Sequence, residues 1–468
     1  MTEQKNQGKN EITISIVGDI LCWSEQNSLA YDQRTNNYDY SESFKLIKKY
    51  FKNSDYVIGN LETTHSGIEN DYTFISEESW YTRIMFNTPD NLAKALRDAG
   101  FNMLTTANNH CMDRGIDGVL RTLQVLDEHG LEHIGTYNSK LERDKIFIKN
   151  IKGFKVIFLN YTHGINYYAH NYSIPKDKSY LINLLARPES QAYEFGTTPC
   201  DIKLNKAGQL IYKINGTSST FVDNIIRENV LADIAKAKEQ NPDLIIVFPH
   251  MGVQYKSYPS RFSRKWVDLL FKAGADVIIA SHPHVLEPME FRTIIDDNGT
   301  KRTGFVIYSM GNFLTSPLYE PTFKALASII LNLHVKKEHN DGATISSVSF
   351  IPTWVQCRDN SGKLAIRTVA IYDALKNSQI SNEIAEKERK ILPLIHQNMI
   401  KLLLGGNDIN IKEEYFLTPT DPKPLKNIEW YFSIIEAITI IVKSIYIVFP
   451  FKSIMKNVRI IWRAYRTK

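Results

Sequence analysis

Residues 276–284 read DVIIASHPH, a short apolar run that ends in two histidines separated by a proline. Five more runs have the same form, apolar and β-rich with a polar end. Near-continuous apolar runs of this length predict strands that are buried on both faces of a sheet. The five are ITISIVGD (12–19), DYVIGNLE (55–62), NMLTTANNH (102–110), LIIVFPH (244–250) and FVIYSMGNF (305–313).

Amphipathic stretches between these runs predict helices. The stretches 89–100 and 117–130 place apolar residues three and four positions apart and end in glycine, which favours a helix C-terminus. Two more, 223–240 and 261–274, precede the runs that start at 244 and 276. The alternation of strand and helix predicts an α/β layered domain over about residues 11–320. Ligands of such sheets gather beyond the carboxyl ends of the strands.

The remaining segments break this alternation. A polar segment, 1–10, precedes the domain, and the stretch 165–222 interrupts it as an insertion. Residues 321–375 contain three alternating strand-like runs, which we expect to complete the domain as an edge sheet or a second layer. A helical and linker segment, 376–427, leads to a helical C-terminal tail, 428–468, that is apolar and then basic.

The tail has two interpretations. Glu436, Lys443 and Pro450 interrupt or end its apolar part, so it lacks a span of about 20 uncharged residues. Its aromatic and basic residues suit contact with a membrane surface. The alternative is a pair of helices packed on the body or on a second subunit.

Composition excludes several classes of protein. A net charge of +5 over 468 residues is too small to indicate a nucleic-acid binder. The four cysteines contain no CxxC pair, so neither a disulfide framework nor a thiolate zinc site is predicted. The N-terminus lacks the basic and apolar regions of a signal peptide. We therefore expect a cytoplasmic protein, or one that its tail attaches peripherally to a membrane.

Side chains that can bind divalent metals stand at the ends of the predicted strands. Oxygen and nitrogen donors without thiolate suit Mn, Fe or Zn, and their number suggests two ions. Each residue has a structural alternative, since an aspartate can cap a turn and asparagines form turns. The candidates are Asp19, Glu62, Asn109, His110, His250, His282 and His284.

The histidine pair is the hardest of these to explain structurally. Pro283 fixes the backbone between His282 and His284, and side chains at i and i+2 of an extended strand share a face. Both imidazoles are therefore expected to point to one place.

Six motifs follow one another over about residues 11–315: VGDI, GNLE, TANNHCMD, FPHMG, SHPHV and YSMGNF. In this order and spacing they resemble the CapA-type poly-γ-glutamate capsule synthesis family, a branch of the calcineurin-like metallophosphoesterases. The resemblance implies a four-layer αββα sandwich with a dinuclear metal site at the strand ends. It also implies a role in capsule biosynthesis, with hydrolysis of a phosphoester or a γ-glutamyl amide bond.

The resemblance assigns roles residue by residue. His110 would stabilise charge on the transferred group or protonate the leaving group, and Asn108 and Asp113 would orient their neighbours. A cap of the following helix is the alternative for Asp113. The implied metal ligands are Asp19, the bridging Glu62, Asn109, His250, and the pair His282 and His284, one for each ion.

Two departures from the pattern bear on activity. Leu21 stands where the wider superfamily has a histidine ligand, a loss that the CapA branch shares. Gln254 stands where the family usually has glutamate. The segment with Tyr161, Thr162 and Asn166 also matches the family, and there we expect a positional role.

The sequence is compatible with three functions. The first is the metal-dependent hydrolase, with an anionic polymer or other capsule-synthesis proteins as partners. The second is a non-catalytic capsule assembly or export scaffold that binds anionic polymer or membrane partners. The third, a nucleotide or protein phosphatase, is disfavoured by Leu21.

Overall fold

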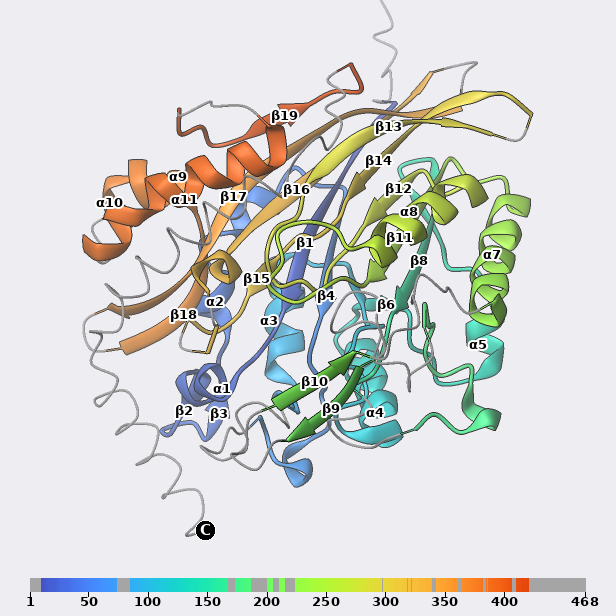
Figure 1. The fold of residues 1–468 in the computed structure, drawn as a ribbon. Coiled ribbons are helices and arrows are strands. Elements are labelled where there is room, and N and C mark those ends of the chain that lie inside the picture. Colours follow the sequence, from blue (N-terminus) through green and yellow to red (C-terminus); the bar gives the residue numbers. More distant parts are fainter. Residues whose placement is uncertain are drawn as a thin grey trace, which may run out of the picture.

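Two β-sheets that pack face to face form the centre of the protein (Figure 1). The structure is a computed structural model. It describes residues 10–420 except 74–84, 167–172, 187–199, 205–209, 215–223, 297, 318, 321, 339–341, 361–362, 382–383, 385 and 406–409. The predicted helical tail, 428–468, therefore lies outside the described residues.

The larger sheet contains nine of the described strands and has β1 near its middle. Its order is β18-β17-β16-β1-β4-β5-β6, with β15 beside β1 and β19 beside β17. β1 is parallel to β4 and β15 and antiparallel to β16. The strands are β1 (Glu11–Ile20), β4 (Tyr56–Leu61), β5 (Met103–Thr105), β6 (Glu132–Ile134), β15 (Asn312–Leu314), β16 (Ala327–Glu338), β17 (Gly342–Asn360), β18 (Lys363–Ala370) and β19 (Tyr415–Leu417).

The second sheet has the order β13-β14-β12-β11-β8-β7. Its four inner strands are parallel, and the edge strands β7 and β13 are antiparallel to their neighbours. The strands are β7 (Ile148–Ile151), β8 (Phe154–Thr162), β11 (Leu244–His250), β12 (Val277–Ile279), β13 (Met289–Ile295) and β14 (Lys301–Ile307).

The run predicted as one strand at 305–313 is two strands in different sheets. β14 ends at Ile307 in the second sheet, and β15 begins at Asn312 in the first. Gly311 makes this crossing possible because its φ of 67° is a left-handed conformation that favours glycine. Gly18 lies against the crossing, where an added Cβ would come within 2.0 Å of the Gly311 carbonyl oxygen. The two glycines let β1 and β15 approach closely.

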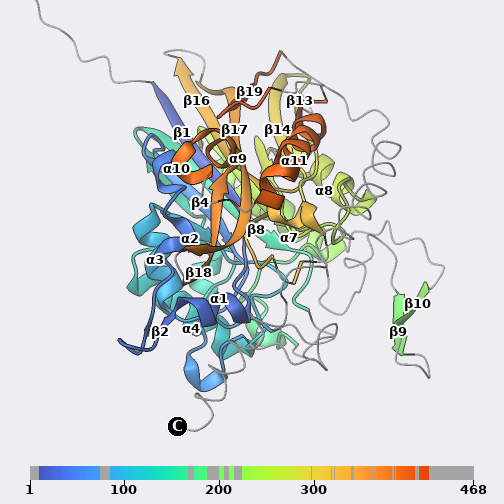
Figure 2. The same cartoon turned by 90° about the vertical axis from the view of Figure 1, so that its left-hand side faces the viewer.

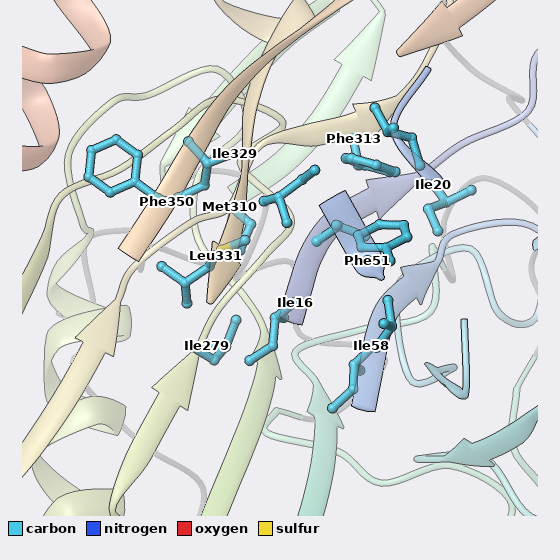
Figure 3. Close-up of a cluster of buried hydrophobic side chains, with 14 of the residues drawn as sticks. Ile16, Ile20, Phe51, Ile58, Ile279, Met310, Phe313, Ile329, Leu331 and Phe350 are labelled. Carbon is cyan, nitrogen blue, oxygen red and sulfur yellow. The ribbon is translucent and has the colours of Figure 1, made fainter. Parts of the chain in front are cut away.

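Alternating side chains bury both faces of the second sheet, as the apolar runs predicted. Val156, Ile246 and Ile279 belong to the core between the sheets. Figure 3 shows Ile279 in this core together with Ile16 and Ile58 of the other sheet. Residues next to them in sequence, Ile157 and Val247, join a separate apolar cluster under helices α7 (Asn224–Glu239) and α8 (Arg261–Ala273). This alternation follows from the two-residue period of a strand.

Helices cover the outer faces of both sheets (Figures 1 and 2). Helices α3 (Asn91–Ala99) and α4 (Gly115–Glu128) pack on one part of the larger sheet, and α9 (Ile371–Lys376) packs on β17 and β18. The predicted α/β class and helix–sheet–sheet–helix layering are thus confirmed. Within the described residues, no helix combines the length and apolar character that a membrane crossing needs.

The other described elements are short or lie at the periphery of the fold. The remaining helices are α1 (Ser24–Ala30), α2 (Ser41–Phe44), α5 (Lys140–Asp144), α10 (Ser378–Ser381), α11 (Glu386–Leu404) and the 3-10 turns at Lys48–Phe51, Ile68–Asn70, Lys176–Lys178 and Phe323–Leu326. The remaining strands form two antiparallel pairs, β2 (Tyr31–Asp32) with β3 (Asn37–Tyr38), and β9 (Cys200–Leu204) with β10 (Leu210–Ile214).

Part of the predicted insertion packs on the body of the protein. Leu181 and Ile182 are buried in one apolar cluster with Met112 and Val119, and Ile182 forms a β-bridge with Thr136. This stretch therefore continues the fold beside α4. The boundary predicted at residue 165 therefore marks a change in sequence pattern and not the end of the packed core.

A buried ion pair attaches α7 to the second sheet. Arg143 on α5 donates to both carboxylate oxygens of Asp233 on α7, at 3.1 and 2.7 Å. The Tyr161 hydroxyl of β8 donates to the same carboxylate at 3.0 Å. Asp233 is only 5% exposed, so its charge depends on these partners.

We expect Asp233→Ala to lower the free energy of unfolding by about 3 kcal/mol, because it leaves a buried guanidinium without its partner. The matched control is Asp98→Ala, which removes an ion pair to Lys94 that is more than half exposed. That change should stay within about 1 kcal/mol. Urea unfolding of both variants measures the difference, and equal losses would contradict the assignment.

Candidate metal centre

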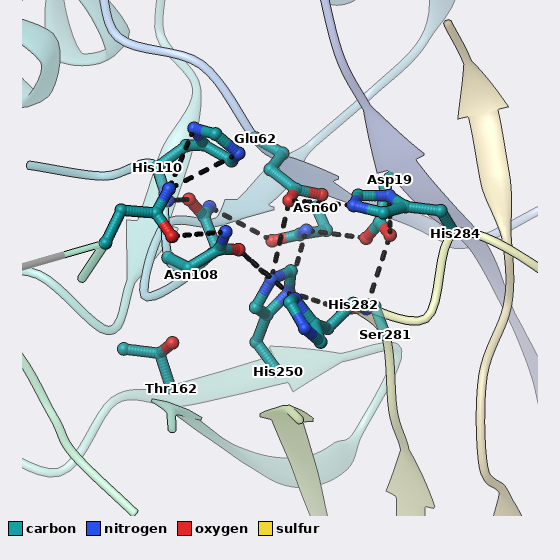
Figure 4. Close-up of polar contacts among 12 residues, drawn as sticks. Asp19, Asn60, Glu62, Asn108, His110, Thr162, His250, Ser281, His282 and His284 are labelled. Carbon is teal, nitrogen blue, oxygen red and sulfur yellow. Dashed lines mark hydrogen bonds and ion pairs between the residues drawn. The ribbon is translucent and has the colours of Figure 1, made fainter. Parts of the chain in front are cut away.

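The carboxyl ends of strands from both sheets meet at one edge of the sandwich (Figure 4). Asp19 belongs to the end of β1, and Glu62 directly follows β4. His250 is the last residue of β11. Asn109 and His110 follow β5, and His282 and His284 follow β12. All these side chains are buried.

The predicted ligands form two groups that share one carboxylate. Glu62, His250 and His282 each place a ligand atom within 4.8 Å of the others, and so do Asp19, Glu62 and His284. Asn109 belongs with the first group, since its Oδ1 lies 2.7 Å from His250 Nε2 and 3.3 Å from His282 Nδ1. The structure therefore brings together all six residues predicted as metal ligands.

Two carboxylates are buried side by side in this centre. Neither oxygen of Glu62 has a hydrogen-bond partner among the described residues. Burial, and then the charge of Asp19, hold the pKa of Glu62 well above its usual value. Burial also raises the pKa of Asp19 to about 6, although hydrogen bonds from Asn60 and from the His282 backbone act in the opposite direction. Like charges buried together are costly unless a cation compensates them.

The imidazoles are kept neutral in this site. Burial holds the pKa of His250 and His282 well below the usual value and lowers that of His284 to about 4. Neutral imidazole offers the lone pair that a metal ion requires. His282 Nε2 and both Glu62 oxygens are buried and have no hydrogen-bond partner among the described residues. The donor chemistry and the buried acceptors therefore fit divalent cations.

The prediction that His282 and His284 lie on an extended strand is wrong. β12 ends at Ile279, and the two histidines have φ angles of 101° and 59°. Each imidazole joins a different donor group, and the two groups share Glu62. Such backbone strain costs on the order of 1–3 kcal/mol per residue and persists where the surroundings impose it. One constraint is the His282 N–H, which donates to Asp19 Oδ2 at 3.3 Å.

His110 and Asp113 form a separate pair beside these groups. His110 Nδ1 donates to Asp113 Oδ2 at 2.7 Å, and the same oxygen accepts from the Phe86 backbone N–H. Helix α4 has no side-chain cap at its N-terminus, so Asp113 orients His110 and does not cap the helix. The Asn166 amide lies 3.2 Å from His110 Nδ1 and accepts a hydrogen bond from Asn109. Asn166 thus contacts both residues of the ANNH motif that lie at the site.

Other polar residues at the strand ends hold the ligands, and most of them have no role that the sequence predicts. Asn60 donates to Asp19 Oδ1 at 2.7 Å. Ser281 Oγ lies 3.0 Å from His250 Nδ1, and the His163 ring centroid lies 4.2 Å from that of His282. Asn108, predicted to orient its neighbours, donates to the Leu61 carbonyl oxygen. Asn60 and His163 carry the same signal as the ligands, a polar side chain at the end of an apolar run.

The residues that depart from the family pattern lie around the centre. Leu21 is buried against Trp23 and Phe86, so an apolar contact fills the position of the missing histidine. Gln254 is half-buried in the loop after β11. Tyr161 points away from the centre, because its hydroxyl bonds Asp233 on the outer side of the sheet.

Comparison with known proteins places this centre in a family context. The family model described as "Bacterial capsule synthesis protein PGA_cap" matches residues 13–317. The "Capsule biosynthesis protein CapA" of Bacillus anthracis is 25% identical over 313 residues, 66% of this chain and 61% of that protein. The "PGA biosynthesis protein CapA" of Bacillus subtilis is 25% identical over 335 residues, 71% of this chain and 70% of that protein.

Similarity to solved structures is remote. The calcineurin-like phosphoesterase YfkN from Bacillus subtilis aligns with 82% of this chain and 99% of its own, with a TM-score of 0.37 and 13% identity. The family match alone covers well over half of the sequence and includes every strand that contributes a ligand. The chain belongs to the bacterial capsule synthesis family described as PGA_cap.

Proposed function

We propose that this protein is a metal-dependent hydrolase in the synthesis of an anionic capsule polymer such as poly-γ-glutamate. Its substrate would contain a phosphoester or a γ-glutamyl amide bond. The observation that carries the proposal is the pair of donor groups that share the buried Glu62. The names of the two Bacillus relatives supply the capsule context.

In such a site, different residues of the chain would bind the cations and transfer the proton. Asp19, Glu62 and His284 would hold one cation, and Glu62 with Asn109, His250 and His282 would hold the other. Two divalent cations supply Lewis acidity and a nucleophile at neutral pH. In its doubly protonated form, with Nδ1–H bonded to Asp113, His110 would donate the Nε2 proton to the leaving group and keep the Nδ1 proton.

A non-catalytic assembly scaffold is the second candidate. Leu21 stands at the position of a histidine ligand in the wider superfamily, so the group of Asp19, Glu62 and His284 contains a single imidazole, and this loss supports the scaffold. In either case we propose an anionic polymer or other capsule-synthesis proteins as partners, and no nucleic acid. We also propose that residues 428–468 contact a membrane surface.

Elemental analysis and hydrolysis assays separate the two candidates. The wild-type protein should contain about two divalent ions per chain, and the double variant His282→Ala, His284→Ala should lose both metal and activity. The control is His129→Ala, His133→Ala, which removes two histidines outside the centre. A chromogenic phosphodiester and a γ-glutamyl anilide serve as substrates. Turnover that is lost together with the metal supports the hydrolase. Substoichiometric metal without metal-dependent turnover on either substrate contradicts the hydrolase and supports the scaffold.

The charge of Glu62 should lower the melting temperature of the metal-free protein. In chelator, Glu62→Gln should melt at a higher temperature than the wild type, because a neutral amide replaces a carboxylate buried beside Asp19. With cation at about 100 times its Kd, the wild type should gain about 2.7 kcal/mol and the variant clearly less. Melting curves with and without Mn²⁺ test this. Glu132→Gln, far from the centre, should respond to Mn²⁺ like the wild type, and an equal response of Glu62→Gln would refute the shared ligand.

His110 should act on the reaction and not on metal binding. Replacement by alanine should lower kcat by about 10²- to 10⁴-fold, the usual contribution of a positioned acid or base. Metal content should stay unchanged, since His110 belongs to neither donor group. Asp113→Asn should give a smaller loss, because the imidazole stays in place with a weaker partner. Loss of metal in His110→Ala would contradict this division of roles.

A further inference from the structure

A chain of hydrogen bonds leads from the centre to a loop that contributes no metal ligand. His284 Nδ1 lies 2.9 Å from Asn312 Oδ1. The Asn312 amide nitrogen donates to Glu320 Oε1 at 2.9 Å and to the Ala325 carbonyl oxygen at 3.1 Å. Thr315 Oγ1 donates to the same Glu320 oxygen at 2.5 Å. Asn312 and Thr315 are fully buried, and His284 is almost fully buried.

The direction of each bond in this chain is determined by its partners. The Ala325 carbonyl oxygen can only accept a hydrogen bond, so the Asn312 NH₂ group must face it and the neighbouring Glu320 Oε1. Its Oδ1 must then face His284, and that oxygen can only accept. His284 therefore carries its proton on Nδ1. Its Nε2, which lies 3.9 Å from Glu62 Oε1, retains the lone pair.

Glu320 is the last side chain of this hydrogen-bond chain, and it lies outside residues 13–317, which match the family model. Its Oε1 accepts from both Asn312 and Thr315, and the indole N–H of Trp23 donates to Thr315 at 3.0 Å. Burial, opposed by hydrogen bonds from Thr315 and Tyr255, raises the pKa of Glu320 to about 8, and the charge of Asp19 adds to the rise.

We propose that Asn312 and Glu320 are positioning residues that fix the tautomer and orientation of His284 for metal binding. Asn312 sets the proton on Nδ1, and Glu320, together with the Ala325 carbonyl, prevents the Asn312 amide from rotating. Partners behind a metal-binding histidine commonly contribute 10- to 100-fold to affinity. The inference rests on the proposed metal centre for its consequence, whereas the tautomer itself is a property of the metal-free chain.

Nitrogen-15 NMR of the metal-free full chain, with labelled histidine, tests the tautomer directly. The His284 signal, assigned by its loss in His284→Gln, should show protonation at Nδ1. In Asn312→Ala the ring should populate both tautomers, while in Glu320→Gln, whose amide oxygen still accepts, Nδ1 should remain protonated. The control Asn332→Ala removes a buried asparagine of β16 that bonds Ser15 and Glu414, and it should leave His284 unchanged. Protonation of His284 at Nε2 in the wild type would overturn the proposal.

Calorimetric titration with Mn²⁺ tests the consequence. Asn312→Ala should weaken one of two binding events by 10- to 100-fold and leave the other within about 3-fold. Glu320→Gln should stay near the wild type, and Glu320→Leu should fall between the two. Equal weakening of both events in a folded Asn312→Ala protein would overturn the positioning role. If wild type binds no Mn²⁺ while the tautomer is as expected, the metal centre fails and the hydrogen-bond assignment stands.

Discussion

The face-to-face packing of the two sheets determines where every functional side chain lies. Asp19 and Glu62 come from one sheet, and His250 and His282 come from strand ends of the other. Neither sheet alone contains a complete donor group, because each group combines carboxylates from the first sheet with imidazoles that follow strands of the second. The apolar core between the sheets is therefore what sets the distances within the centre.

The metal-free centre destabilises the folded state, and the rest of the fold must offset this cost. Two carboxylates are buried with few partners, and His282 and His284 have strained backbones. Each of these features disfavours the metal-free state, and each would be relieved or used by cations held between the sheets. Electrostatic repulsion and strain thus point to the same function as the geometry does. This agreement is stronger support than the identity of any single ligand.

The strand ends could be predicted from sequence because burial on both faces leaves a nearly continuous apolar run, and a polar residue at its end is conspicuous. This signal located Asp19, Glu62, Asn109 and His250 correctly at one edge of the sandwich. It failed where conformation depends on tertiary contacts, as in the left-handed backbone of His282. It also missed Glu320, which follows no apolar strand and acts through a neighbour.

The position of β1 has a consequence for synthesis of the chain. β1 ends at Ile20, but its antiparallel partner β16 begins at Ala327, roughly 300 residues later. At ribosomal rates of about 5–20 residues per second, β16 emerges roughly 15–60 s after β1. During that interval one edge of an apolar central strand has no partner, which exposes the nascent chain to wrong pairings. The topology therefore makes correct pairing of β1 depend on protection of this edge until β16 has been synthesised.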